Sequence, residues 1–416
     1  MKAKTCGFIL FMLLFFVGSA SAQFLERLGK SAERAAKRTV ERRVEREASK
    51  KTDEALDKVF ERDKPKNAKH KNEAKTQPMD ELSGFSAQSK FDFIPGDKVI
   101  FFDDFHLDAT GDFPVKWNTN GSGEVVELRN IPGKWLRVPD NTISFPEINS
   151  RLPQNFTVEF DLVYPASGER PPVTFGFSEV ANPAKNSIQH KKIFYFLIPP
   201  SVNQHIGYST SLYSGRETTT EWAVDKMANK IIRVSIAVNA NRVRLYLDSR
   251  KLFDLPRGFD ENSYRNNFHL RASPLIPQPK DGFYISNLRV AESGKDARTE
   301  LLKTGKFSTT GIYFASGSAQ IKPESHGVIK EIADALNEDA AMKIEIIGHT
   351  DNTGNATSNQ SLSEKRAAAV QSYLNNNFQI SNDRISTSGK GQSEPVADNS
   401  TPEGKAQNRR VEFVKK

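Results

Sequence analysis

The sequence contains a single cysteine, Cys6, among its 416 residues. Cys6 precedes an apolar run at residues 8–17, and Ala20-Ser21-Ala22 follows as an A-x-A cleavage site, so residues 1–22 are predicted to be a secretory signal peptide. If cleavage follows Ala22, the mature chain has no cysteine, and no lipid-acceptor cysteine stands at the cleavage site. Disulfides, thiol catalysis and cysteine-containing metal sites are then excluded.

Long apolar runs and metal-binding patterns are also missing. The run at residues 8–17 is too short to span a bilayer, and no later segment reaches about 18 consecutive apolar residues, so no transmembrane helix is predicted. The seven histidines show no H-E-x-x-H or other metal spacing. Neither a G-x-S-x-G motif nor a Gly-rich phosphate-binding loop occurs. We therefore predict no metal and no cofactor.

The positive charge is concentrated near the N-terminus. The formal net charge is +8, and residues 23–75 hold seventeen Lys or Arg against eleven Asp or Glu, an excess of six positive charges. The rest of the chain is nearly balanced. A nucleic-acid-binding core would carry its basic patch on a folded domain, so nucleic acid is not a predicted partner.

Residues 23–62 are predicted to form a charged amphipathic helix. Apolar residues, most of them small, recur at every fourth position, namely Leu28, Ala32, Ala36, Val40, Val44 and Ala48. Two interpretations stay open: a helix that associates with a protein partner or an anionic outer-membrane surface, and a solvated spacer helix with i,i+4 charge pairs. Residues 63–90, with Pro65 and Pro78, are predicted to be a flexible linker.

Residues 91–290 change to short β-like runs. Turn residues such as Pro95-Gly96-Asp97 separate them, and Asn239-Ala240-Asn241 joins two alternating runs as a hairpin. The clearest runs are residues 99–102, 125–128, 135–138, 156–164, 192–198, 231–238, 243–247 and 283–290. Many short strands with little helix predict an all-β sandwich. Residues 291–306 are charged and polar, and are predicted to be a second linker.

Residues 307–416 are predicted to be an α/β domain. A short strand at 311–314, a helix opened by Pro323 and a strand at 343–347 come first. A helix that carries Arg366 and strands at 384–388 and 410–414 complete a β-α-β-α-β-β order. Asp351 lies just past the strand at 343–347, where α/β folds place ligands. From the residues alone, Asp351 and Arg366 form either a ligand site or a structural ion pair.

Several motifs in this region resemble the OmpA-like C-terminal domain, a family that binds peptidoglycan non-covalently in the bacterial envelope. They are Gly348-His349-Thr350-Asp351-Asn352-Thr353-Gly354, Asn359, Leu362-Ser363, Arg366-Ala367 and Asn408-Arg409-Arg410-Val411-Glu412. The resemblance covers residues 310–416, about a quarter of the chain. One departure is Ala315, since family members often carry an acid just after the aromatic pair that is Tyr313-Phe314 here.

The resemblance implies a binding site for the diaminopimelate end of a peptidoglycan stem peptide. Asp351 would bind its ammonium and Arg366 its carboxylate, because a planar guanidinium holds a carboxylate bidentately. Other residues sit where the family lines or supports the groove, namely Thr350, Asn352, Asn359 and Leu362. Arg409 and Arg410 are secondary candidates, for which a structural role near the final strand is at least as well supported.

The middle region resembles, more weakly, a concanavalin-A-like jelly roll. The resemblance rests on Phe102-Asp103-Asp104-Phe105, Phe113-Pro114, Trp117, the hairpin at 233–248 and the closing run 285–290. Its positions are mostly core and turn residues. The predicted fold class is therefore multidomain: an N-terminal charged helix, an all-β jelly-roll sandwich at 91–290, and an α/β OmpA-like domain at 307–416.

Glu159 and Asp161 raise the question of an enzyme in the sandwich. On a strand they face the same side, and paired carboxylates serve glycoside hydrolysis. Jelly-roll glucanases carry a third carboxylate two or three residues further on, whereas apolar residues follow here. We interpret the pair as an exposed polar face of a half-buried strand. Tyr208, Tyr213 and Trp222 either stack on sugar rings or belong to the core.

The sequence thus predicts a non-enzymatic envelope protein, secreted across the inner membrane into the periplasm and associated with the outer membrane. Its C-terminal domain would bind peptidoglycan and tether the sandwich to the wall. The alternative is a glycan-binding or glycan-processing protein whose sandwich carries the activity.

Overall fold

The structure is a computed structural model, and it describes residues 91–165, 172–180, 182–183, 192–199, 206–211, 216–218, 228–260, 264–272, 282–294 and 296–416. The predicted signal peptide, N-terminal helix and first linker lie outside these residues, as do Tyr213 and Trp222. All described residues belong to one compact unit, Ser86–Lys416. None of the helices in this part of the chain is both long and apolar enough to cross a membrane.

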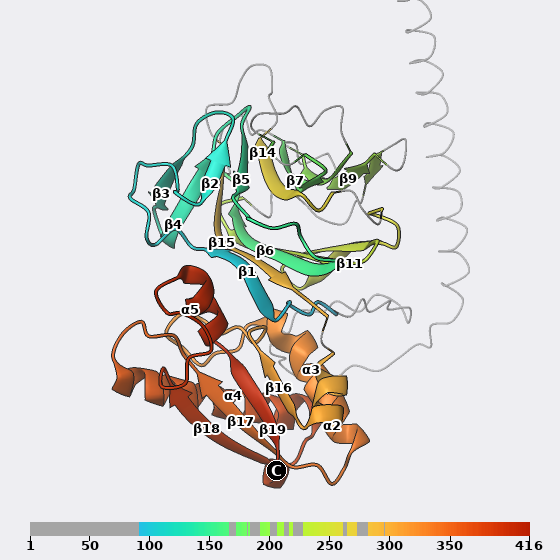
Figure 1. Cartoon of the computed structure of the whole chain (residues 1–416), viewed down its shortest axis with the longest axis vertical. Helices are drawn as coiled ribbons and strands as arrows, with labels where there is room; N and C mark the ends of the chain where they lie inside the picture. The colour runs from blue at the N-terminus through green and yellow to red at the C-terminus, as the bar shows by residue number, and fades with distance from the viewer. Residues whose placement is uncertain are drawn as a thin grey trace, which may run out of the picture. The chain divides into compact units, whose positions relative to one another are not determined.

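Two antiparallel sheets form a β domain (Figure 1). The first contains β1 (Lys98–Asp103), β3 (Glu124–Leu128), β4 (Ile131–Val138), β6 (Asn155–Val163), β11 (Ile231–Asn239), β12 (Arg242–Leu247), β13 (Arg250–Leu255) and β15 (Phe283–Glu292). Its strand order is β13-β12-β11-β6-β15-β4-β3, with β1 also paired to β15. The second contains β2 (Trp117–Thr119), β5 (Ile143–Pro146), β7 (Val173–Ser178), β8 (Ile193–Ile198), β9 (Gly207–Thr210), β10 (Arg216–Thr218) and β14 (Asn267–Ala272). Its order is β10-β9-β8-β7-β14-β5-β2.

An aromatic core lies between the two sheets. Alternate residues of β6 enter it, and the ring of Phe160 meets that of Phe175 on β7 edge to face, with centroids 5.4 Å apart. Tyr208 packs against this core as well. Each fully buried aromatic or aliphatic side chain contributes about 1.5–3 kcal/mol. The predicted strand runs and the hairpin at Asn239-Ala240-Asn241 are all present, whereas the closer resemblance to a jelly roll stays a prediction.

The C-terminal domain is a mixed sheet with helices. Its elements are α2 (Ala297–Thr304), β16 (Lys306–Thr309), η2 (Pro323–Ser325), α3 (His326–Glu338), β17 (Ile344–His349), α4 (Ala356–Phe378), η3 (Asn382–Arg384), β18 (Ile385–Gly391), α5 (Pro402–Asn408) and β19 (Val411–Lys415). The strand order is β16-β19-β17-β18, with β17 and β18 parallel. Gly348 lets α4 approach β17, because a Cβ there would lie 2.2 Å from the Ser363 carbonyl oxygen.

The prediction of a linker at residues 291–306 is wrong. Strand β15 continues to Glu292, and α2 begins after Asp296, whose side chain accepts a hydrogen bond from the Thr299 amide. Leu301 of α2 is fully buried in the C-terminal core. The helix was missed because its fully buried residues are only Ala297 and Leu301, one turn apart among charged and polar residues.

Two further details of the predicted β-α-β-α-β-β order differ. The first strand is β16 at Lys306–Thr309, whereas Phe314 makes only an isolated bridge to Ile321. A short helix, α5, precedes the last strand. Its signal was Thr401-Pro402: the Thr401 hydroxyl caps the helix by accepting from the Gly404 amide, and Pro402 occupies the first turn.

The prediction that Glu159 and Asp161 form an exposed polar face is also wrong. Glu159 is fully buried; its carboxylate accepts from Arg289 Nη1 at 3.0 Å, Arg233 Nη2 at 3.2 Å and the Tyr313 hydroxyl at 2.9 Å. Asp161 pairs with Arg233 at 3.1 Å. We call these five residues the buried ion cluster. It leaves neither carboxylate free for hydrolysis.

The buried ion cluster joins the two domains. Tyr313 belongs to the C-terminal domain, and the guanidiniums of Arg233 and Arg289 lie 5.8 and 6.0 Å from the centre of its ring. Arg289 also donates to the Thr310 hydroxyl at 2.6 Å. The outer face of β6 is therefore covered by the C-terminal domain. An alternating strand pattern does not predict that a second domain covers the strand, because the pattern is the same whether water or another domain lies over the polar face.

Candidate functional site

The loop between β17 and α4 is held by its own polar residues. Asp351 follows the strand end, and its Oδ1 accepts the Thr353 amide at 2.9 Å. Asn359, buried on the first turns of α4, donates to the carbonyl oxygens of Asp351 and Thr353 at 3.3 and 3.0 Å, and to Gln392 Oε1 at 2.7 Å. Asn359 thus fixes the loop that presents Asp351, which is a supporting role.

The remaining loop residues divide by exposure. Thr350 is buried; its amide donates to the Gly391 carbonyl oxygen and its hydroxyl to the Asp351 carbonyl oxygen, both at 2.8 Å. Asn352 is exposed, with its amide 3.3 Å from Asn399 Oδ1. Leu362 is half-buried on α4. Thr350 shapes the loop, whereas Asn352 and Leu362 retain surface for a ligand.

Arg409 is the ion-pair partner of Asp351. Its Nη1 donates to Asp351 Oδ2 at 2.6 Å, and it follows directly after α5. Burial raises the pKa of Asp351, but the Thr353 amide and the Arg409 guanidinium outweigh it and hold the pKa below its ordinary value. Asp351 is therefore an anion at neutral pH. Arg409 was predicted only as a secondary candidate, and its motif Asn408-Arg409-Arg410 was the available signal.

Arg366 contacts Ser318 and Phe314 and makes no hydrogen bond to Asp351. Its Nε donates to the Ser318 carbonyl oxygen at 3.1 Å, and its guanidinium carbon lies 4.9 Å from the centre of the Phe314 ring. Burial first, and then the nearby Arg409, lower its pKa, while Asp351 raises it. Within the described residues, Arg366 thus lies in electrostatic range of Asp351 without an ion pair to it. In the part of the chain that the structure describes, its two terminal nitrogens make no hydrogen bond or ion pair.

Arg410 points away from this site. It is buried, and its Nε and Nη2 lie 2.8 and 2.7 Å from Glu412 Oε1. His349 is also buried, with its Nε2 3.5 Å from the same carboxylate oxygen. In the described part of the chain, neither ring nitrogen of His349 has a hydrogen-bond partner. Arg410 and His349 therefore belong to a structural cluster between β17 and β19.

His349 makes a testable contribution to stability. Burial, and next the charge of Arg410, lower its pKa to about 4. Between pH 6.5 and 4 the unfolded chain binds a proton that the folded chain excludes, so this contribution is complete above pH 6.5 and is lost as the pH falls to 4. It amounts to about 3 kcal/mol.

We expect His349→Gln to remove this dependence. Urea unfolding at pH 7 and pH 4.5 should show that the variant loses about 2–3 kcal/mol less stability than the parent chain over this range. The other titrating groups are common to both chains, and most of their contributions cancel in the difference. His106→Gln, at an exposed histidine, is the control. Equal losses in the parent chain and His349→Gln would contradict the assignment.

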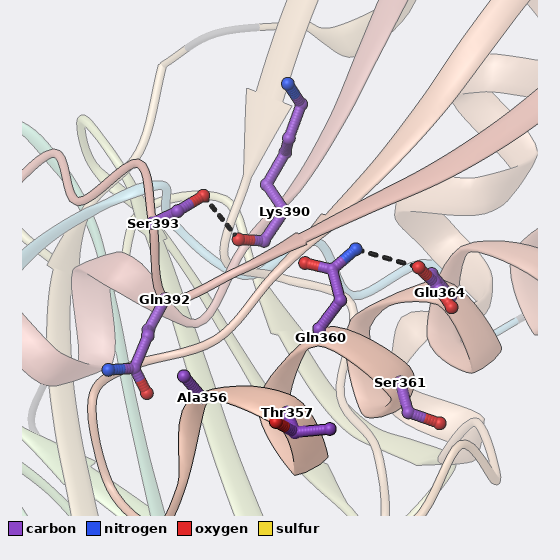
Figure 2. Close-up of a pocket in the computed structure, with 8 residues that line it drawn as sticks. All are labelled: Ala356, Thr357, Gln360, Ser361, Glu364, Lys390, Gln392 and Ser393. Carbon is purple, nitrogen blue, oxygen red and sulfur yellow. Dashed lines mark hydrogen bonds between the residues drawn. The ribbon is translucent and has the colours of Figure 1, made fainter.

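A separate groove of about 520 Å³ lies beside the start of α4 and is lined by Ala356, Thr357, Gln360, Ser361, Glu364, Lys390, Gln392 and Ser393 (Figure 2). Gln360 Nε2 donates to Glu364 Oε1 at 2.7 Å. None of the predicted site residues lines this groove. Among the described residues, no group of three or more His, Cys, Asp or Glu side chains is placed to hold a metal ion.

Residues 313–409 match the OmpA family. The chain is 36% identical over 127 residues to outer membrane porin F of Pseudomonas aeruginosa, covering 30% of this chain and 35% of the porin. It is 40% identical over 103 residues to the peptidoglycan-binding protein ArfA of Mycobacterium tuberculosis, covering 25% of this chain and 31% of ArfA. The chain thus spans about a third of the length of these two relatives.

Among solved structures, the peptidoglycan-associated lipoprotein from Burkholderia pseudomallei is similar at 28% identity, with 26% of this chain and 89% of that chain covered and a TM-score of 0.24. The family match includes all the predicted site residues except Arg410.

Proposed function

We propose, from the premise that this chain carries an OmpA family domain at its C-terminus, that this domain binds peptidoglycan non-covalently. In doing so it attaches the β domain to the cell wall, in the periplasm and in association with the outer membrane. The chain then acts as an anchor and catalyses no reaction. The sequence similarity to ArfA, which is named as peptidoglycan-binding, supports this proposal.

The arrangement of Asp351 and Arg366 carries the proposal. A diaminopimelate stem peptide ends in a carbon that bears both an ammonium and a carboxylate. An ionised carboxylate at the end of β17 and a guanidinium on α4 offer one partner to each group. Both side chains are mostly withdrawn from water, and charge-assisted hydrogen bonds are stronger there than in bulk solvent.

The site also has features that favour a small zwitterion over a ligand that carries negative charge alone. Asp351 Oδ2 already accepts from Arg409, so a ligand ammonium shares that carboxylate with Arg409. The Arg366 guanidinium is stacked on Phe314, which restricts its plane and leaves its terminal nitrogens for a carboxylate. Asn352 and Leu362, which retain exposed surface, would contact the neighbouring parts of the stem peptide.

Co-sedimentation of the purified full chain with sacculi of two chemistries tests the proposal. Diaminopimelate-type sacculi present the ammonium and the carboxylate, whereas lysine-type sacculi present the ammonium alone. We expect the dissociation constant to be about tenfold or more lower for the diaminopimelate type, because one charged hydrogen-bonded contact is lost with lysine. Equal affinity for both would remove the proposed role of Arg366, and no sedimentation with either would remove the anchor function.

A further inference from the structure

Strand β1 of the β domain runs along helix α5 of the C-terminal domain (Figure 1). One side of β1 pairs with β15, and two amides on its other side are capped by α5. The Val99 amide donates to Gln407 Oε1 at 3.0 Å, and the Phe102 amide donates to Glu403 Oε1 at 3.3 Å. Glu403 also pairs with Lys116 at 2.7 Å. An edge strand covered in this way does not pair with other chains.

Arg409 lies where this contact meets the candidate site. Its guanidinium carbon is 5.1 Å from the centre of the Phe102 ring, while its Nη1 donates to Asp351 Oδ2. Phe102 is half-buried and belongs to β1, about 250 residues earlier in the chain than Asp351. One guanidinium therefore bridges an aromatic ring of the β domain and the acid proposed to bind the wall.

We propose that the β domain forms part of the wall-binding site, with Phe102 as a positioning residue that orients Arg409 against Asp351. This inference rests on the proposed function. A cation held over a ring face is attracted by the ring quadrupole, and the attraction strengthens when the pair is shielded from water. The ring thus selects one orientation of a long side chain that would otherwise sample many rotamers.

The consequence of this orientation falls on Asp351. Arg409 fixes one carboxylate oxygen and keeps the acid ionised in a mostly buried place. Without the ring, Arg409 spends less time on Oδ2, and the carboxylate is both less ordered and more easily protonated. The orientation of the acid toward a ligand ammonium, and its charge at acidic pH, would then weaken together.

Substitutions at Phe102 in the full chain test this role by co-sedimentation with diaminopimelate-type sacculi between pH 3 and pH 7. We expect Phe102→Leu to weaken binding about threefold to tenfold, and Phe102→Trp to restore it, because only an aromatic ring attracts the cation. The pH at which binding falls to half should be higher for Phe102→Leu than for the parent chain. A purely structural role predicts no such shift in the pH profile.

Phe253→Leu is the control, because Phe253 lies on β13 of the same sheet, with β12, β11 and β6 between β13 and β15, the strand that pairs with β1. It should bind as the parent chain does. Parent-like affinity for Phe102→Leu would overturn the inference, and so would Phe102→Trp binding as weakly as Phe102→Leu. Two outcomes separate the proposals: no sedimentation of the parent chain overturns the proposed function, and parent-like binding by Asp351→Asn overturns the role of Asp351 within it. Loss of binding in Asp351→Asn with no loss in Phe102→Leu overturns only the inference.

Discussion

Replacing Glu159 by alanine is expected to lower the free energy of unfolding by about 3–5 kcal/mol. The substitution leaves the guanidinium of Arg289, only 4% exposed, without its carboxylate, and it removes three hydrogen bonds to one side chain. Removing one partner of a buried ion pair destabilises the fold by more than the pair contributes in net terms. The reason is that the remaining charge stays buried and keeps its desolvation penalty. Arg233 would retain Asp161, so the loss centres on Arg289 and Tyr313.

Urea unfolding, followed by tryptophan fluorescence, measures this effect. Glu292→Ala is the matched control, because Glu292 pairs with Lys98 at 3.0 Å in an exposed position and should cost less than about 1 kcal/mol. Glu159→Ala and Tyr313→Phe should also be non-additive in a double-mutant cycle, since the two side chains share a hydrogen bond. If Glu159→Ala lowers the free energy of unfolding by no more than Glu292→Ala does, the buried ion cluster does not stabilise the fold as described.

The cluster also marks the limit of what the sequence could predict. Glu159 and Asp161 alternate with apolar residues along one strand, which is the pattern of a strand with one wet face. Their arginine partners are neighbours only through strand pairing: Arg289 lies opposite Glu159 on β15, and Arg233 lies opposite Asp161 on β11. Registers of this kind connect residues more than 70 positions apart, and no local pattern specifies them.

The candidate site was predictable to a different degree. Strand β17 and helix α4 follow from apolar periodicity, and the loop between them places Asp351 where it was expected. The ion-pair partner of Asp351 could not be predicted in the same way. The resemblance pairs Asp351 with Arg366, but the hydrogen bond comes from Arg409, which directly follows α5. A seven-residue helix with one polar cap leaves little periodicity to detect.

Asp351→Asn is expected to lower the affinity for diaminopimelate-type sacculi about 100-fold. Asparagine keeps the shape of the side chain but removes the charge, and truncating a hydrogen-bonded, mostly buried charge pair costs about 2–5 kcal/mol. Arg366→Met should weaken binding to a similar extent, because its stem still packs beside Phe314 while the guanidinium is gone. Glu364→Gln is the control on the same helix, since Glu364 lines the groove of Figure 2 and contacts none of these residues. Co-sedimentation isotherms for the four chains give the dissociation constants.

The two substitutions should differ in the type of sacculi for which they lower the affinity. Arg366→Met removes the partner of a carboxylate that lysine-type sacculi do not have, so it should cost affinity on the diaminopimelate type only. Asp351→Asn removes the partner of the ammonium, which both types present, and should cost affinity on both. Arg366 donates its Nε hydrogen bond to Ser318 and not to Asp351, so neither substitution breaks a hydrogen bond between the two residues. If Arg366→Met weakens binding equally to both types of sacculi, Arg366 supports the loop and does not bind the carboxylate. The proposed orientation of the ligand, with its carboxylate on Arg366, is then wrong.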